Sequence, residues 1–275
     1  MISPDLYDLV MSHTHGNTLT RTILINGKAR TISVYTDEDQ ELHRKIKDVL
    51  WKDYRKRFSP NCYAYVKGKS CIDAIFDINK KVRKYGGYIR TDIKGFFPSI
   101  SRELLGGMLR MDYPEDFVNK VLSFVAIGGI GISQGSALSP LLSNIYLMQF
   151  DETLSAICRY YRYSDDMLIL CDRSYIDSVL ASIDSGLQAL LLTRSIEKTF
   201  SGDLNDGFHY LGFYVNKKGV CAALNKKTEL DEKVMDICAA GHSTIKERMD
   251  KMHQSCVSVV SFGREPRFDE RAVVL

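Results

Sequence analysis

The sequence predicts a mixed α+β fold, and three observations lead to this prediction. Segments with strand-like alternation lie on both sides of short turn signals, as in Thr20–Thr36 and Tyr160–Cys171. Segments with apolar residues at helical spacing occur between them, as in Asp37–Phe58 and Tyr175–Leu191. No glycine-rich dinucleotide fingerprint accompanies the expected strands. At 275 residues, with 45% hydrophobic and 26% charged, the chain can bury one large core or one core with a smaller lobe.

The chain is expected to begin with a hairpin followed by a long helix. Strand-like alternation over Thr20–Thr36 is interrupted by Asn26 and Gly27, a dipeptide that favours the tight turn between antiparallel strands. A helix is expected over Asp37–Phe58. One face of that helix carries the apolar residues Leu42, Ile46, Val49 and Leu50.

The later elements follow the same two patterns. A second helix over Cys71–Tyr85 is expected to end at two glycines, before a strand over Tyr88–Phe97 that runs into a turn. Ser139–Leu154 is expected to form one helix, with Ser139 as its N-cap and Pro140 in the first helical position. Further expected elements are a β-hairpin over Tyr160–Cys171, a helix over Tyr175–Leu191, and a strand pair over Phe208–Val215 and Gly219–Leu224.

The cysteines and the N-terminus indicate a reducing compartment. Seven cysteines are present, an odd number without any CxxC pair, so neither a disulfide framework nor a zinc site is expected. Free thiols of this kind suit the cytoplasm. The N-terminus lacks a basic region followed by an apolar one, and the longest apolar run, residues 122–132, is too short to span a bilayer. We therefore expect a cytoplasmic protein without a membrane segment.

Positive charge is concentrated in one part of the chain. The net charge is only +3, yet residues 41–90 contain 14 Lys or Arg and 5 Asp or Glu. Trp51, Tyr54 and Phe58 lie among these cations. Basic residues interleaved with aromatics fit a nucleic-acid backbone, while a solvated amphipathic helix explains the same pattern without any ligand.

Two adjacent carboxylates, Asp165 and Asp166, lie between the strand-like runs "YYRY" and "MLIL". The pair is either a solvated hairpin tip or a site for a cation. Asp92, which ends another apolar strand, favours the second interpretation, because a lone carboxylate there is costly to bury. Three clustered carboxylates repel one another, and two Mg²⁺ ions relieve that repulsion in phosphoryl-transfer sites. Mg²⁺ prefers such hard oxygen ligands.

Five segments in order resemble the reverse transcriptase family. They are "RTDIKGFFPSI", "GISQGSALSPLLSNIYL", "YRYSDD" (the YxDD hairpin), "SIEKTF" and "YLGF". Upstream, "KARTISV" and "YVKGKSCIDAI" resemble finger segments of that family. The second segment is very similar to the form found in bacterial and group II intron enzymes. The resemblance runs from about Lys28 to Val215.

The resemblance implies an α+β right-hand polymerase with fingers, a palm of antiparallel sheet plus helices, and a short helical thumb. It places the fingers at residues 1–90 and the palm at 91–215, with a fingers-side insertion around 101–130. The thumb or C-terminal region is then 216–275, which leaves no room for a ribonuclease H, maturase or endonuclease domain.

The resemblance also implies the reaction centre. Asp92, Asp165 and Asp166 would hold two Mg²⁺ ions, with Mn²⁺ as an alternative, and the carbonyl of Ile93 would be a further ligand. Lys198 would protonate the leaving pyrophosphate; a lysine at such a position is otherwise an ordinary surface residue.

Further residues are implied to contact substrates. Phe97 would be the steric gate that excludes a ribose 2′-hydroxyl, although "FF" pairs are usually core. The nucleotide would be bound by Lys28, Arg30, Gln134 and Gly135, and the primer grip would be Tyr210, Leu211 and Gly212. The nucleic acid would contact Arg55, Lys56, Lys67 and Lys69. Without the resemblance, Lys28, Arg30 and Gln134 suit a solvated strand face and a polar loop.

The implied activity is RNA-directed DNA synthesis from dNTPs on an RNA template, with DNA as product. The size resembles that of bacterial retron-like or defence-associated enzymes, which use a dedicated non-coding RNA and often assemble with other subunits or as homo-oligomers. Two alternatives remain open: a template-independent nucleotidyltransferase, and a non-catalytic RNA-binding scaffold on a polymerase fold.

Overall fold

A computed structural model of the chain describes residues 2–16, 18–25, 28–126 and 129–222. The chain divides into two compact units, each described here by itself: unit 1 comprises residues 1–74 and 87–202, and unit 2 comprises residues 75–86 and 203–275. Most of the expected thumb lies outside the described residues. In the described part, no helix is both long and apolar enough to cross a membrane.

Unit 1 mixes helices and strands, as expected. In chain order it contains α1 (Pro4–Ser12), β1 (Leu19–Ile25), β2 (Lys28–Val34), α2 (Asp37–Tyr54), β3 (Gly87–Asp92), α4 (Phe96–Ser99), α5 (Arg102–Arg110), α6 (Glu115–Phe124), α7 (Ser139–Tyr146), α8 (Met148–Ile157), β4 (Arg159–Tyr163), β5 (Asp166–Cys171), η2 (Arg173–Tyr175), α9 (Ile176–Ala189) and η3 (Ile196–Lys198). Unit 2 contains η1 (Val82–Lys84), β7 (Phe208–Tyr210), β8 (Phe213–Asn216) and β9 (Gly219–Ala222). Two elements have residues in both units, α3 (Cys71–Lys81) and β6 (Phe200–Asp203).

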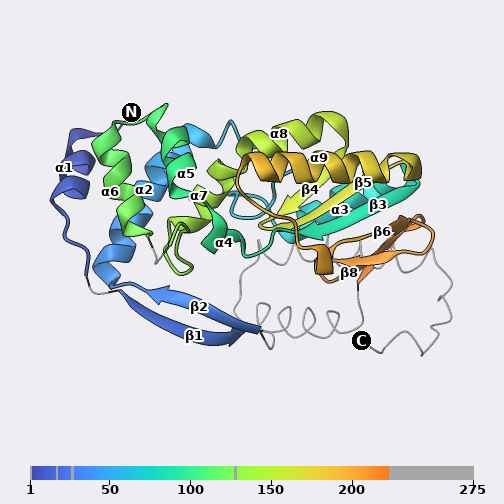
Figure 1. The fold of residues 1–275 in the computed structure, drawn as a ribbon, viewed down its shortest axis with the longest axis horizontal. Coiled ribbons are helices and arrows are strands. Elements are labelled where there is room, and N and C mark those ends of the chain that lie inside the picture. Colours follow the sequence, from blue (N-terminus) through green and yellow to red (C-terminus); the bar gives the residue numbers. More distant parts are fainter. Residues whose placement is uncertain (1, 17, 26–27, 127–128, 223–275) are drawn as a thin grey trace, which may run out of the picture. The chain divides into compact units, whose positions relative to one another are not determined.

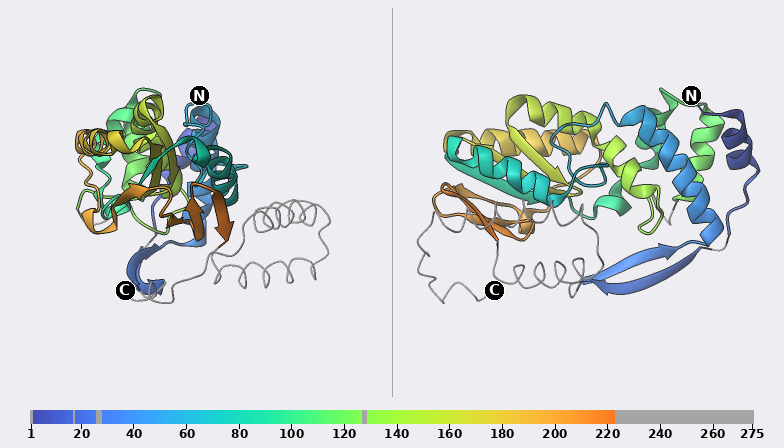
Figure 2. Two further views of the ribbon diagram at one scale, coloured as in Figure 1. Left: turned by 90° about the vertical axis from the view of Figure 1, so that its right-hand side faces the viewer. Right: turned by 180° about the vertical axis from the view of Figure 1, so that it is seen from behind.

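The predicted N-terminal hairpin is confirmed. β1 and β2 pair antiparallel, with Leu19 opposite Val34 and Ile25 opposite Lys28. The expected turn residues, Asn26 and Gly27, lie outside the described residues. Figure 2 shows β2 leading into α2.

The helix predicted to follow the hairpin forms but is shorter than expected. It begins at Asp37, where the side chain of Thr36 accepts a hydrogen bond from the amide of Asp39 at 3.1 Å. It ends at Tyr54, not Phe58, because the amide of Arg57 bonds to the Tyr54 carbonyl at 2.8 Å in a tight turn before Pro60.

The single helix predicted over Ser139–Leu154 is wrong in two respects. The chain forms two helices, α7 and α8, which meet at Leu147 (φ −91°, ψ 1°). Leu138 precedes the first helix, so Ser139 is its first residue and not its N-cap. Nearly every residue of α7 is buried, so its apolar pattern has no preferred face that could reveal where the axis changes direction.

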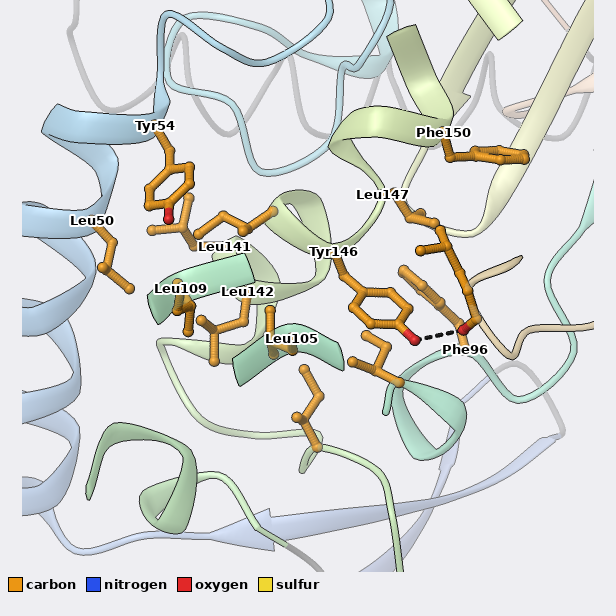
Figure 3. Close-up of a cluster of buried hydrophobic side chains, with 14 of the residues drawn as sticks. Leu50, Tyr54, Phe96, Leu105, Leu109, Leu141, Leu142, Tyr146, Leu147 and Phe150 are labelled. Carbon is orange, nitrogen blue, oxygen red and sulfur yellow. Dashed lines mark hydrogen bonds between the residues drawn. The ribbon is translucent and has the colours of Figure 1, made fainter. Parts of the chain in front are cut away.

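The predicted insertion forms two helices, α5 and α6. They pack against each other, and α5 packs against α7. Figure 3 shows Leu105 and Leu109 of α5 near Leu142 of α7. The Tyr146 hydroxyl donates to the Leu190 carbonyl at 2.5 Å, which joins α7 to the end of α9.

The central sheet of unit 1 has the strand order β4-β5-β3-β6. β5 runs antiparallel to both β3 and β4. Successive residues of a strand point to opposite faces of the sheet, and helices cover one of these two faces. On the covered face, Ile89, Tyr160 and Ile169 belong to the hydrophobic core together with side chains of α8 and α9. Figure 1 shows these two helices running along the sheet.

Unit 2 corrects the prediction of one strand over Phe208–Val215. β7 and β8 form an antiparallel hairpin in which Tyr210 lies opposite Phe213. The two turn residues, Leu211 and Gly212, have φ of 50° and 80°. Positive φ at both positions is typical of a two-residue hairpin turn, and the leucine at the first position hides this turn in the sequence. β9 continues the sheet as expected, up to the last described residue.

Candidate active site

Three strand ends bring the predicted carboxylates together. Asp92 ends β3, Asp166 begins β5, and the two residues lie directly opposite each other. Asp165 belongs to the two-residue turn between β4 and β5. The Ile93 amide donates to the Asp165 carbonyl at 3.2 Å, so the backbone of Ile93 faces this turn. Residues directly opposite in a sheet share a face, so Asp92 and Asp166 both lie on the face opposite the covered one, here called the carboxylate face.

Two cations accompany the carboxylates. The Lys198 ammonium lies 2.6 Å from Oδ1 of Asp92, and Nε of Arg90 lies 3.6 Å from Oδ1 of Asp166. Arg90 precedes Asp92 by two residues in β3, so alternation places it on the same face. Sequence reasoning missed Arg90, although this alternation could have revealed it.

Lys198 reaches the site because the chain before it runs alongside the end of β3. The Ser195 amide donates to the Asp92 carbonyl at 2.8 Å, and the Lys94 amide donates to the Thr193 carbonyl at 2.9 Å. These bonds hold residues 193–195 beside Asp92, and η3 follows immediately. The predicted acid Lys198 is therefore brought to Asp92 by backbone pairing.

The electrostatics of the site favour added positive charge. Burial raises the pKa of Asp166 to about 6; Arg90 opposes this, while Asp92 and Asp165 raise it further. Burial also raises the pKa of Asp92, against the effect of Lys198, and Asp165 adds to the rise. Both carboxylates are thus ionised less readily than a solvated aspartate, although each has a cation beside it.

The donor chemistry fits a hard divalent cation. All three side chains offer carboxylate oxygens, the ligands that Mg²⁺ prefers. In the described part of the chain, no group of three or more His, Cys, Asp or Glu side chains is arranged so that it could hold a metal ion. Lys198 and Arg90 are the cations that lie beside the carboxylates. That these three carboxylates hold such a divalent ion stays a prediction.

The aromatic pair after the turn divides into one core residue and one partly exposed residue. Phe96 is 3% exposed and lies in the core, whereas Phe97 is half-buried. Their ring centroids are 5.5 Å apart in an edge-to-face arrangement. Phe97 packs against the core but is partly exposed, and its predicted contact with a sugar stays a prediction.

Gln134 and Gly135 lie in a loop that is bound to β2 and α2. The Ser33 amide donates to the Gln134 carbonyl at 2.7 Å, and the Gln40 side chain donates to the Gly135 carbonyl at 2.7 Å. Gly135 has φ +121°, and a Cβ there would lie 2.1 Å from the Ser33 carbonyl oxygen. The glycine is thus required by close approach to the chain's own β2 strand; its predicted contact with a nucleotide stays a prediction.

The predicted basic contacts differ in their surroundings. Arg30, opposite Ile23 in the hairpin, and Arg55 and Lys56, after α2, are exposed. Lys67 pairs with Asp48 at 3.2 Å.

Lys69 already has a role in the fold, and the predicted primer grip lies in the other unit. The Lys69 ammonium donates to the carbonyls of Pro60 and Cys62 and so closes its own loop. The predicted primer grip, Tyr210 to Gly212, forms the β7–β8 turn of unit 2. Lys28 begins β2.

The described cysteines agree with the expectation of free thiols. Cys62, Cys71, Cys158 and Cys171 in this part of the chain are free. Burial raises the pKa of Cys62 to about 11 and that of Cys171 to about 11. These two thiols are therefore protonated near neutral pH and are poor nucleophiles.

Comparison with known proteins identifies the family. A profile of the family described as "Reverse transcriptase (RNA-dependent DNA polymerase)" matches residues 15–215. The chain is 32% identical over 120 residues to the retron Ec83 reverse transcriptase of Escherichia coli, covering 38% of this chain and 37% of that protein. It is 27% identical over 139 residues to the group II intron-encoded protein LtrA of Lactococcus lactis subsp. cremoris, covering 46% of this chain and 23% of that protein.

Solved structures support the same fold. Telomerase from Candida albicans, in complex with a fragment of telomeric RNA, matches with a TM-score of 0.60 at 12% identity, covering 78% of this chain and 46% of that chain. This likeness confirms the predicted α+β polymerase fold. The chain spans less than half the length of the two curated relatives and of this structure. With the matched profile over residues 15–215, the chain belongs to the reverse transcriptase (RNA-dependent DNA polymerase) family.

Proposed function

We propose that the chain is an RNA-directed DNA polymerase that extends a primer 3′-hydroxyl with dNTPs on an RNA template. The observation that carries this proposal is the convergence of Asp92, Asp165 and Asp166 at one end of the sheet, in a chain of the reverse transcriptase family. A non-catalytic scaffold would have no need for three clustered carboxylates, in which burial and then mutual repulsion raise the pKa of Asp166 to about 6.

The three carboxylates, with the Ile93 carbonyl, would hold two Mg²⁺ or Mn²⁺ ions. Bound ions supply charge stabilisation for an in-line attack of the hydroxyl on the α-phosphorus and for the departure of pyrophosphate. Lys198, which contacts Asp92 in the structure, has to release Oδ1 before that oxygen can act as a ligand. Once released, its ammonium would protonate the leaving pyrophosphate.

Substrate selection is assigned to the half-buried Phe97 ring. Packed under the sugar, it would leave no room for a 2′-hydroxyl and so favour dNTPs. Arg30 on the exposed hairpin would bind the triphosphate, and Gln134 would contact the nucleotide or the template base. The exposed Arg55 and Lys56 would contact the nucleic-acid backbone by charge.

The domain boundaries and biological setting belong to the same proposal. We assign the fingers to residues 1–90, the palm to 91–215 and the thumb to the chain from 216 onward. The similarity to a retron reverse transcriptase supports a dedicated non-coding RNA as template, in a bacterial retron-like or antiphage role. A protein partner or a homo-oligomer would complete the assembly.

Primer extension on a defined RNA template, with single dNTPs and Mg²⁺, tests the activity. The expected product is complementary DNA, lost in Asp92→Asn and Asp165→Asn but retained in Asp172→Asn, a matched exposed aspartate beyond β5. Products that ignore the template would instead indicate a template-independent transferase. The absence of incorporation with intact protein and RNA binding would indicate a scaffold.

A further inference from the structure

Arg162 lies directly behind the reaction centre. It is the middle residue of "YRY" in β4, opposite Met167, and alternation places its side chain on the covered face. Its side chain is 0% exposed, and that of its partner Asp151 in α8 is 1% exposed. A fully buried ion pair destabilises the fold unless its geometry is good and its hydrogen bonds are complete.

Each N–H of this guanidinium has an acceptor. Nε and Nη2 bind the two carboxylate oxygens of Asp151 at 2.7 and 2.5 Å. Nη2 also donates to the sulfur of Cys62 at 3.2 Å. Nη1 donates to the Asn144 side-chain oxygen at 3.1 Å and to the Ser164 carbonyl at 3.0 Å. The five donors of the group are therefore fully used, which fixes the plane of the guanidinium.

The bond to Ser164 connects this network with the carboxylates. Ser164 is the first residue of the turn that carries Asp165, and its φ is +60°. A non-glycine residue is strained in this region and remains there only when its surroundings hold it. The Ser164 carbonyl accepts from Arg162 on the covered face, while Asp166 lies on the carboxylate face.

Neighbouring segments hold Arg162 itself in place. Its backbone amide donates to the Asn61 carbonyl, and its carbonyl accepts from the Tyr63 amide, each at 2.9 Å. The Tyr160 hydroxyl donates to Asp151 at 2.9 Å. The guanidinium is thus held by Cys62 in the loop after α2, by Asn144 in α7 and by Asp151 in α8, in addition to its contact with the turn.

We propose that Arg162 is a positioning residue for DNA synthesis. Held by Asp151, it fixes the strained Ser164 turn from the covered face and so sets Asp165 and Asp166 against Asp92. This inference rests on the proposed function for its catalytic consequence, but the positioning of the carboxylates can be measured without catalysis. A residue that merely stabilised the fold would be replaceable by an equally stable apolar pair.

The double variant Arg162→Met/Asp151→Leu separates these two roles. It removes both charges together, which buried ion pairs often tolerate without loss of stability, yet it leaves the Ser164 carbonyl without its donor. We expect a folded protein whose thermal midpoint is lowered no more than that of the control variant below, but a kcat for single-nucleotide extension about 10- to 100-fold lower, with a much smaller change in KM for the dNTP. A folded double variant with wild-type kcat would overturn the proposal. Val118→Ala, in the buried face of α6, is the control: it lowers stability and leaves kcat unchanged.

The second measurement is the affinity of the protein for Mn²⁺ in the absence of nucleic acid. Mn²⁺ is titrated into the protein, and its binding is followed by electron paramagnetic resonance. We expect the double variant to bind Mn²⁺ several-fold more weakly than the wild type. If the wild type makes no DNA, the proposed function is wrong. If the two proteins bind Mn²⁺ with equal affinity, or if neither binds it, the positioning role of Arg162 is overturned. If the double variant does not fold, Arg162→Lys replaces it, because a single ammonium cannot contact Asp151, Asn144 and Ser164 together. Wild-type kcat and Mn²⁺ affinity in that variant would overturn the proposal.

Discussion

Asp166→Asn tests the electrostatic account of the reaction centre through stability. The pKa of Asp166 in the folded chain is about 6, against an ordinary value of 3.8. Because the pKa of Asp166 is higher in the folded chain than in the unfolded chain, the ionised carboxylate lowers the free energy of unfolding at pH above 6. This destabilisation disappears as the pH falls through the pKa of the folded chain towards that of the unfolded chain. At about 1.4 kcal/mol per pH unit, the cost at pH 8 without divalent ions is about 3 kcal/mol. The side chain is 23% exposed, so solvent screens only part of it.

The asparagine variant, which cannot ionise, is therefore expected to be more stable than the wild type. In EDTA at pH 8, urea unfolding should show a gain of about 2–3 kcal/mol, falling to about 1 kcal/mol at pH 4.5. Mg²⁺ should narrow the difference at pH 8 by stabilising the wild type alone. Asp172→Asn, an exposed aspartate at the other end of β5, should change stability by less than about 0.5 kcal/mol at either pH. The reasoning is refuted if the Asp166 variant gains nothing at pH 8, or gains equally at both pH values.

The other predictions concern three more positions. Lys198→Met should lower the Mg²⁺ concentration needed for half-maximal thermal stabilisation about two- to fivefold, because the half-exposed ammonium no longer competes for Asp92; an unchanged concentration would contradict this. Phe97→Ala should raise the ratio of ribonucleotide to deoxynucleotide incorporation in primer extension, whereas Phe96→Leu should lower stability alone; unchanged sugar selectivity counts against the gate. Gly135→Ala should cost more than about 2 kcal/mol in urea unfolding, since its Cβ would lie 2.1 Å from a β2 carbonyl oxygen. Gly107→Ala, in the open on α5, should stabilise by about 0.5–1 kcal/mol, and equal effects at the two glycines would refute the packing argument.

Local sequence patterns determined the elements that build the site. Alternation and turn chemistry predicted the hairpin that carries Asp165 and Asp166, and the strand that ends at Asp92. These features depend on neighbouring residues, so period and turn preference are enough to find them. The same patterns failed where burial is uniform, as in α7, and at Leu211, where a leucine adopts a glycine-like φ.

By itself, then, the sequence determined the family, the strand ends and the three carboxylates of the proposed reaction centre. Only the tertiary structure decided which cations stand beside them, that Lys198 pairs with Asp92, and that Cys62 and Asn144 contact the guanidinium of Arg162. These contacts join residues as far as 106 positions apart along the chain, and they arise from strand register and helix packing. No local pattern encodes such distances, because the free energy that selects the contacts comes from burying the whole core at once.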